Sequence, residues 1–193
     1  MQILYCRQYE IKKEGKTMNK TIFVAGVYGV GKDYLCDTIS ETTGIKKFSA
    51  SQLISNINKE NYAENKDVKD KKMNQVILRE EVHKLLQRYK TIILTGHMCI
   101  LDKYMNIEVL PQDVYANLEI TSMVLLKNKP NIIVQNLIKR DGKEYNEELI
   151  DKFQRKEEEL FIKVAKDIKA KSLIIDLLYD DSDLERFQKF LEV

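Results

Sequence analysis

The segment from Ile22 to Cys36, IFVAGVYGVGKDYLC, holds the residues whose spacing points most clearly to chemistry. A short apolar run is followed by three spaced glycines and by Lys32, at the predicted start of a helix. Glycines allow successive backbone N–H groups to turn toward one phosphate, and the helix N-terminus adds a partial positive charge. Lys32 adds a full charge for the terminal phosphates. The spacing therefore predicts a phosphate-binding loop.

The loop departs from the pattern G-x-x-x-x-G-K-[ST] at its last position, where Asp33 replaces the hydroxyl residue that ordinarily ligates Mg²⁺. The helix dipole favours a carboxylate there by about 0.3–1 kcal/mol. A phosphate oxygen ~4 Å away repels it by ~4 kcal/mol at an effective dielectric constant of about 20. Either Asp33 holds Mg²⁺, or triphosphate binding is impaired. The predicted nucleotide contacts are Gly26, Val27, Tyr28, Gly29, Val30, Gly31, Lys32, Asp33 and Tyr34.

The chain has 193 residues, of which 44% are hydrophobic and 32% are charged, and this composition is typical of one globular domain. The net charge of +2 comes from interspersed charges, which disfavours nucleic acid as the main ligand. Three cysteines without C-x-x-C spacing argue against a disulfide framework or a zinc site and predict a reducing cytoplasm. No apolar run reaches the ~18–20 residues of a membrane span.

Residues 1–17 precede the predicted domain, which covers residues 18–193. Lys13-Glu14-Gly15 has codons that can spell a purine-rich ribosome-binding sequence, so Met18 could be the natural start and residues 1–17 an extension. Alternatively, Gln2 to Cys6 pairs as an edge strand. The segment has no clear hydrophobic period, and both interpretations stand at this point.

Strands and helices alternate along the rest of the chain, which predicts an α/β fold: a five-stranded parallel sheet with helices on both faces. The predicted strands are Ile22 to Ala25, Ile45 to Phe48, Ile92 to Leu94, Ile120 to Leu126 and Leu173 to Asp176. Helices are expected at Lys32 to Thr42, after Ser49-Ala50-Ser51, at Met73 to Tyr89, at Asn131 to Lys139, from a cap at Asn146 to about Ala170, and at Asp183 to Leu191. Asn58 to Lys72, Met98 to Asn117 and the charged turn Lys139 to Lys143 are expected as connections, the first a binding loop and the second with a short helix.

Two polar side chains follow the predicted strand Ile92 to Leu94, in the sequence Thr95-Gly96-His97. Ligands of open α/β sheets bind outside the carboxyl ends of the strands. Thr95 and His97 are therefore expected beside the phosphate-binding loop. His83 lies in the middle of a predicted helix and is expected to be structural.

Four stretches, GVYGVGKDYL, IKKFSASQLI, ILTGH and LIKRDGKEYNEELIDKF, resemble the small adenylate kinases of the archaeal and eukaryotic nuclear type and related bacterial P-loop nucleotide kinases. The resemblance covers roughly Asn19 to Leu178. It implies a P-loop NTPase fold of the nucleoside-monophosphate-kinase type, with an acceptor-binding arm near residues 49–75 and a lid near residues 139–145. It also implies that Arg140 covers the transferring phosphate, with Arg155 as a second candidate. The implied acceptor contacts are Ser49, Asn74, Gln75 and Arg79.

The chain departs from that family's pattern at two positions, since the family usually has Asp-x-His where this chain has Thr95-Gly96-His97, and Ser or Thr where it has Asp33. In the resembled fold the two positions face each other across Mg²⁺. One interpretation is a decayed site. The other, which we favour, is a reciprocal exchange in which Asp33 and Thr95 keep a hard-oxygen shell for Mg²⁺.

The predicted function is transfer of the γ-phosphoryl group from ATP, with Mg²⁺, to a nucleoside monophosphate or another small acceptor. Lys32 and Arg140 would neutralise charge, and His97 would orient phosphate or water. One alternative is an ATPase or nucleotide-dependent switch that acts on a protein or ribonucleoprotein partner. A second is a catalytically weakened nucleotide-binding scaffold. Acceptor-dependent ADP formation separates transfer from the switch.

Overall fold

A computed structural model of the chain describes residues 20–58 and 71–192. The predicted N-terminal extension, and its alternative as an edge strand, lie outside the described residues. Most of the predicted loop from Asn58 to Lys72 also lies outside them. The described residues are the ones that build the sheet, its covering helices and the site below.

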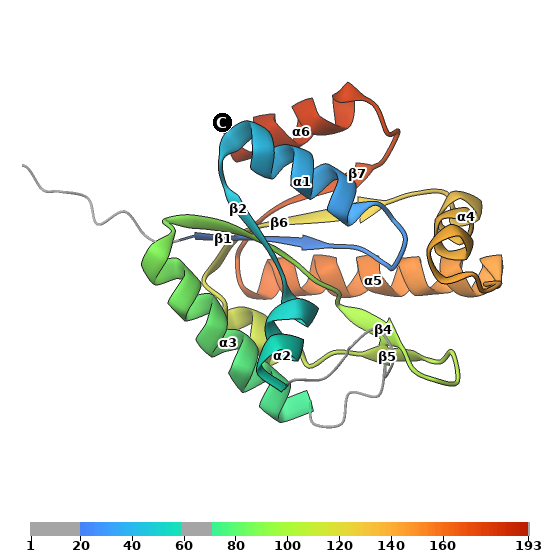
Figure 1. The fold of residues 1–193 in the computed structure, drawn as a ribbon, viewed down its shortest axis with the longest axis horizontal. Helices are drawn as coiled ribbons and strands as arrows, with labels where there is room; N and C mark the ends of the chain where they lie inside the picture. The colour runs from blue at the N-terminus through green and yellow to red at the C-terminus, as the bar shows by residue number, and fades with distance from the viewer. Residues whose placement is uncertain (1–19, 59–70, 193) are drawn as a thin grey trace, which may run out of the picture.

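A five-stranded parallel sheet forms the centre of the fold, in the strand order β2-β3-β1-β6-β7 (Figure 1). Its central strand β1 is apolar on both faces, and Ile22 to Ala25 are at most 4% exposed. Such continuous burial is typical of a parallel strand covered on both sides. The strands are β1 Lys20–Ala25, β2 Lys46–Ser49, β3 Thr91–Thr95, β6 Ile120–Lys127 and β7 Lys171–Asp176.

Helices cover both faces of this sheet, α1 and α6 on one and α3 and α5 on the other (Figure 1). The longest, α5, buries a stripe that includes Phe153, Leu160 and Phe161. The predicted α/β fold, with its five parallel strands and two covered faces, is confirmed. The helices are α1 Lys32–Thr43, α2 Ala50–Asn58, α3 Lys71–Arg88, α4 Pro130–Asp141, α5 Glu147–Asp167 and α6 Asp181–Leu191.

The predicted helix ends follow local chemistry. Gly44 ends α1 in the left-handed conformation at φ 74°, and its N–H donates to the Ser40 carbonyl over 2.9 Å. Pro130 occupies the first turn of α4, where its missing N–H costs nothing. The Asn146 side chain caps α5 by accepting a hydrogen bond from the Leu149 N–H over 2.9 Å.

Several predicted elements differ from the structure, and the largest differences lie in three segments. Met98 to Asn117 was expected as a loop with a short helix, but it forms a hairpin of β4 Cys99–Leu101 and β5 Ile107–Val109 before the 3₁₀ helix η1 Gln112–Asn117. Strands of three residues are too short to show a hydrophobic period. The predicted charged turn after Lys139 is helical through Asp141, and Gly142 then ends α4 at φ 65°. Helix α5 ends at Asp167 rather than near Ala170, and Lys169 follows at φ 56°.

Strand pairing fixes where the site lies. Thr95 at the end of β3 pairs with Val24 in β1, and the Gly96 N–H donates to the Val24 carbonyl over 3.0 Å. Strand β1 lies between β3 and β6 in the sheet. The loop after β1 therefore starts at the topological switch point of the sheet, from which the chain builds strands outward in both directions. The segments that follow β1 and β3 therefore lie side by side at one edge of the sheet.

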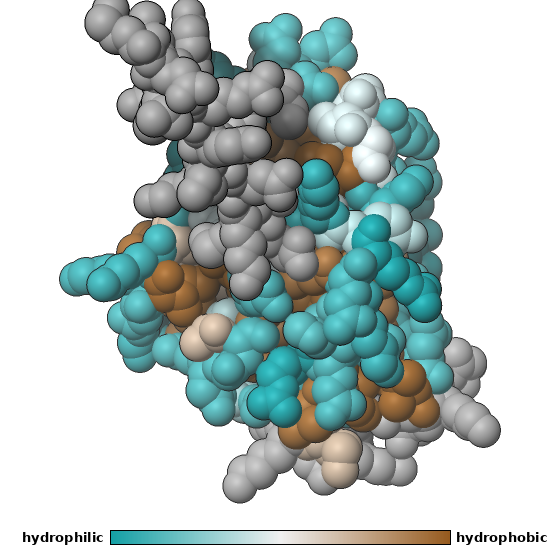
Figure 2. Space-filling model, turned by 90° about the vertical axis from the view of Figure 1, so that its left-hand side faces the viewer, coloured by the Kyte–Doolittle hydropathy of each residue, from teal (hydrophilic) through white to brown (hydrophobic). Residues whose placement is uncertain are grey.

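On the face shown in Figure 2, hydrophilic side chains are interspersed with smaller hydrophobic areas. Cys36 and Cys99 are buried free thiols inside the fold. Among the helices that the structure describes, none has both the length and the apolar character needed to cross a membrane.

Candidate active site

The loop between β1 and α1 has the backbone of a phosphate cradle. Gly29 and Gly31 have φ of 74° and 105°, in the left-handed region that favours glycine. A Cβ at Gly29 would also lie 2.8 Å from the Leu137 side chain, so α4 approaches the loop too closely for any other residue. The loop ends at the N-terminus of α1, where free N–H groups and the helix dipole favour an anion.

Lys32 is folded over this loop. Its Nζ donates to the carbonyls of Gly26 and Val27 over 2.7 and 3.1 Å. Burial of the ammonium lowers the pKa of Lys32 to about 8, against the opposing effect of the Glu157 and Asp33 carboxylates. A bound polyphosphate would favour the charged form, so Lys32 is suited to bind one as a cation.

Asp33 has a partner that its sequence position did not reveal. The Lys47 Nζ on β2 lies 3.0 Å from Asp33 Oδ1 and 2.7 Å from Asp37 Oδ1. The sequence predicted that Asp33 either holds Mg²⁺ or impairs triphosphate binding. The structure adds a third interpretation, in which Lys47 partly neutralises the Asp33 carboxylate and so weakens its repulsion of a phosphate.

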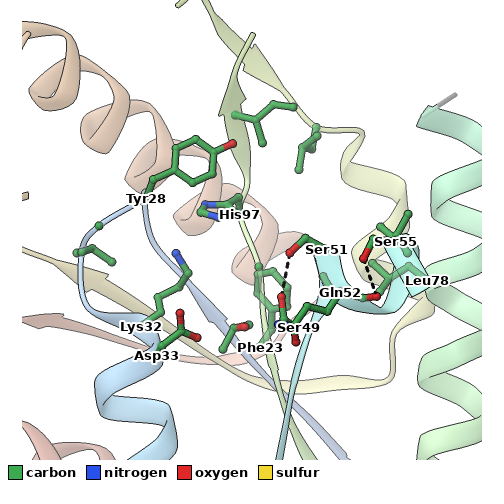
Figure 3. A pocket seen from close by; sticks show the side chains of 18 of the residues that line it. Phe23, Tyr28, Lys32, Asp33, Ser49, Ser51, Gln52, Ser55, Leu78 and His97 are labelled. Atoms are coloured by element: carbon green, nitrogen blue, oxygen red, sulfur yellow. Dashed lines mark hydrogen bonds between the residues drawn. The ribbon is translucent and has the colours of Figure 1, made fainter. Parts of the chain in front are cut away.

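His97 lies against the loop on its other side, as Figure 3 shows, with Tyr28 and Lys32 around it. The ring centroids of His97 and Tyr28 are 4.4 Å apart. Burial, and then the neighbouring Lys32 charge, hold the pKa of His97 well below its usual value. The imidazole is therefore neutral at pH 7, and its buried Nδ1 has no hydrogen-bond partner. Tyr115 of η1 fixes the backbone here by donating to the His97 carbonyl over 2.7 Å.

Glu157 of α5 is a site residue that the sequence analysis missed. Its carboxylate is fully buried and accepts hydrogen bonds from the N–H groups of Gly26, Met98 and Cys99 over 2.9 to 3.1 Å. The Cys99 thiol donates to the same carboxylate over 3.3 Å. Burial raises the pKa of Glu157, while the backbone donors and Lys32 favour its ionised form. One carboxylate thus joins the start of the phosphate loop to the turn that carries His97.

Two further residues hold the loop from the C-terminal half of the chain. Asn136 of α4 donates through Nδ2 to the Gly29 carbonyl over 2.8 Å and to the Tyr179 hydroxyl over 3.0 Å. The Tyr179 hydroxyl donates in turn to the Val30 carbonyl over 3.2 Å. Neither contact had a signal in the sequence, because both partners are far away along the chain.

Arg140, in the last turn of α4, also faces the site. Its guanidinium forms two bonds to Asp141, from Nε over 2.6 Å and from the terminal Nη2 over 2.8 Å. The Tyr145 hydroxyl donates to the same carboxylate. Hydrogen bonding to Asp141 raises the pKa of Arg140. Nε and Nη2 hold Asp141, and a guanidinium has five N–H donors, so other N–H groups of Arg140 could reach a phosphate.

A cavity of about 1050 Å³ connects these groups with α2 and α3. It brings together the following predicted site residues: Tyr28, Gly29, Val30, Gly31, Lys32, Asp33, Tyr34, Ser49, Asn74, Gln75, Thr95, His97 and Arg140. Gly26 and Val27 lie at the base of the loop, behind the lining. Arg79 is exposed on α3 and does not line the cavity. Arg155 is also outside it, on the α5 surface, paired with Asp151 over 2.7 Å.

Two side chains that line the cavity are candidate ligands for a divalent cation, Asp33 and Thr95. The Thr95 hydroxyl donates to the Phe48 carbonyl over 3.4 Å, and Asp33 is paired with Lys47. Within residues 20–58 and 71–192, no three His, Cys, Asp or Glu side chains gather as a metal site. Mg²⁺ in nucleotide sites takes most of its ligands from phosphate and water, with one or two from protein. Asp33 and Thr95 are of the right chemical kind for those protein ligands.

Solved structures of similar fold include two shikimate kinases and a gluconokinase. The shikimate kinase from Acinetobacter baumannii, solved with shikimate, has a TM-score of 0.61 at 14% identity, over 90% of this chain and 93% of its own. The shikimate kinase from Bacteroides thetaiotaomicron has 0.54 at 17%, over 90% and 99%. The gluconokinase from Sinorhizobium meliloti 1021 has 0.52 at 15%, over 91% and 97%. At such identities the likeness concerns the fold.

No curated protein is significantly similar to the chain in sequence. A protein-family model described as an AAA domain matches residues 25–154, from the end of β1 into α5. The match includes the phosphate loop, Lys32, His97 and Arg140. Because it spans more than half of the 193 residues, the protein belongs to the AAA domain family, and its fold is that of a P-loop kinase.

Proposed function

We propose that this protein transfers the γ-phosphoryl group of ATP to a small acceptor molecule. The observation that carries the proposal is the continuity of one cavity, from the phosphate loop with Lys32 at one side to the side chains of α2 and α3 at the other. A donor bound on the loop and an acceptor beside α2 and α3 would share that cavity. Phosphoryl transfer requires mainly such positioning, together with neutralisation of charge.

Three residues of the chain would do most of this work. Lys32 would leave the carbonyls of Gly26 and Val27 to bind the terminal phosphates of ATP. Arg140 would contact the transferring phosphoryl group through N–H groups that Asp141 does not occupy. His97, as a neutral imidazole, would orient that group or the acceptor by hydrogen bonding.

Mg²⁺ would supply further charge neutralisation at the phosphates when bound, and Asp33 and Thr95 are the residues that we propose hold it. The support is chemical, since the Asp33 carboxylate and the Thr95 hydroxyl line the same cavity as Lys32. Asp33 would then divide its charge between the cation and Lys47, its partner at 3.0 Å.

Two kinds of acceptor enter the proposal. The resemblance to adenylate kinases favours a nucleoside monophosphate, held by Ser49, Asn74 and Gln75. The named structural neighbours phosphorylate shikimate or gluconate, which favours a small metabolite instead.

The alternative is a nucleotide-dependent switch, favoured by the pairing of Arg140 with Asp141 instead of an open guanidinium. A labelled γ-phosphoryl group distinguishes the two. If ATP and Mg²⁺ are supplied with mixed small-molecule acceptors, transfer predicts label in an organic phosphate and ADP formation that depends on the acceptor. A switch predicts label in inorganic phosphate at a rate that no acceptor changes.

A further inference from the structure

We infer that the acceptor is an uncharged compound that carries several hydroxyl groups and one apolar face. The inference rests on the proposed phosphotransfer and names the substrate class of the same cavity. It follows from the side chains that line the half of the cavity away from the phosphate loop.

Neutral hydrogen-bonding side chains dominate this acceptor half. Ser49 ends β2 and Ser51 lies in the first turn of α2, with their hydroxyl oxygens 3.0 Å apart, and Gln52 and Ser55 follow on that helix (Figure 3). Helix α3 contributes Asn74 and Gln75. Hydroxyl and amide groups can both donate and accept, so they match a ligand whose own groups do the same.

One residue of this lining, Gln75, has a side-chain N–H group that lacks a hydrogen-bond acceptor. Its Nε2 is buried and has no hydrogen-bond partner, although the residue lines the cavity. A buried amide donor without a partner is costly, and a ligand oxygen would remove that cost. The acceptor half is therefore built for a ligand that supplies oxygen atoms.

Part of the same lining is apolar. Ile100 of β4, Leu110 after β5 and Val114 of η1 contribute carbon surface, and Leu78 of α3 adds more. Apolar side chains bind the carbon face of a ring or chain by excluding water from it. A compound with hydroxyl groups on one side and C–H groups on the other satisfies both parts of the lining.

Charge decides between an anionic and a neutral acceptor. Among the described residues that line the cavity, the cations are Lys32, Arg140 and Lys143. Lys32 belongs to the phosphate loop, Arg140 is the residue that we propose contacts the transferring phosphoryl group, and Lys143 follows the end of α4. A carboxylate or phosphate in the acceptor half would lose water without gaining a counterion from these residues, which is unfavourable.

The reaction then has a simple balance. The oxygen of an acceptor hydroxyl forms a bond to the γ-phosphorus of ATP, while the bond from that phosphorus to the β,γ-bridging oxygen breaks. ADP leaves with the electron pair of the broken bond. The hydroxyl proton passes to an oxygen of the transferred phosphoryl group and from there to water.

Matched pairs of acceptors that differ in one ionised group test the inference. The full chain is given labelled ATP and Mg²⁺ with adenosine or AMP, with each other nucleoside or its monophosphate, and with glucitol or gluconate. We expect the uncharged member of a pair to be phosphorylated, with kcat/KM at least about 10-fold above that of its anionic partner. Preference for the anionic member would overturn the inference and leave the proposed phosphotransfer standing. Label in no acceptor, with ADP still formed, would overturn both.

A variant pair on α3 gives a second readout. Gln75→Ala removes the unpartnered amide, and we expect it to raise the KM of the neutral acceptor about 10-fold without changing the KM of ATP. Gln87→Ala, on the exposed face of the same helix, should change neither constant. An unchanged acceptor KM in Gln75→Ala would contradict the assignment of this half of the cavity.

Discussion

The N–H of Gly26, the first residue of the phosphate loop, donates to Glu157 Oε1 over 3.1 Å, across 131 positions of sequence. Met98 and Cys99 donate to the same carboxylate, directly after His97. Helix α5 therefore sets the position of the loop and of the His97 turn relative to each other. We propose no contact of Glu157 with nucleotide or acceptor, and its role is to position the loop and the His97 turn.

Replacement of Glu157 by Gln should separate positioning from simple stability. The carboxamide keeps the shape but puts an N–H₂ group against backbone N–H donors, which should cost about 1–3 kcal/mol of unfolding free energy. We also expect the Kd of ATP, measured by calorimetry at a temperature where the variant is folded, to rise about 10-fold.

Gln154→Ala is the matched control for this change. Gln154 is also buried on α5, but its side chain bonds the backbone of Asn128 and not that of the phosphate loop. Gln154→Ala should lose about as much unfolding free energy as Glu157→Gln and keep the parent protein's Kd of ATP. Equal ATP affinities in the two variants would show that Glu157 is structural only.

The proposed Mg²⁺ ligands predict a coupling between two positions. Asp33→Asn should weaken ATP binding in the presence of Mg²⁺ by about 10-fold, because it removes an anionic oxygen at nearly constant size. The double variant Asp33→Ser with Thr95→Asp restores a hydroxyl and a carboxylate in exchanged positions, and should recover most of the activity that either single change loses. A double-mutant cycle on kcat/KM measures this coupling, and purely additive losses would exclude a shared cation site.

The pKa of Lys32 predicts a pH dependence of nucleotide binding. With a pKa of about 8 in the free protein, Lys32 is charged at pH 7 and loses its proton above about pH 8. Since the charged form binds phosphate, the Kd of ATP should be flat below that pH and rise above it. Calorimetric titrations from about pH 6.5 to about pH 9.5 would follow this change, and Lys32→Met should lack the step.

The same shift has the opposite effect on folding. The unfolded lysine keeps its proton up to about pH 10.4, so it binds more protons than the folded residue in the range between. The contribution of Lys32 to the unfolding free energy of the nucleotide-free protein should therefore increase as pH rises above about 8. The measured quantity is the unfolding free energy of the parent protein minus that of Lys32→Met. A decrease of this quantity as pH rises above about 8 would contradict the assigned direction of the Lys32 pKa shift.

The sequence predicted what local pattern controls. The glycine spacing before Lys32 identified the phosphate loop, and the five apolar runs identified the sheet. Helix caps at Gly44 and Asn146 were also predictable, because each depends on one residue and its immediate neighbours. The pairing of β1 with β3 follows from the α/β pattern, which is why His97 could be placed next to the loop.

What the sequence could not supply are contacts between distant segments. Lys47 reaches Asp33 only because β2 runs beside α1, and Tyr179 reaches Val30 across 149 positions of sequence. Glu157 did carry a signal, since it lies four residues from both Phe153 and Phe161 on the buried stripe of α5. A carboxylate in such a stripe indicates buried donors, but their identity depends on the fold.

The role of the phosphate loop is measured by the transfer of a labelled γ-phosphoryl group from ATP by Lys32→Ala, with Lys163→Ala on the exposed surface of α5 as control. The charge of Lys32 lies over the phosphate loop, where it would bind the terminal phosphates of ATP. Loss of this charge should reduce transfer to an acceptor by at least about 100-fold while the fold is kept. Lys163→Ala should transfer at the parent rate. Equal transfer by Lys32→Ala and Lys163→Ala would remove the phosphate loop from the reaction and contradict the proposed phosphotransfer at this site.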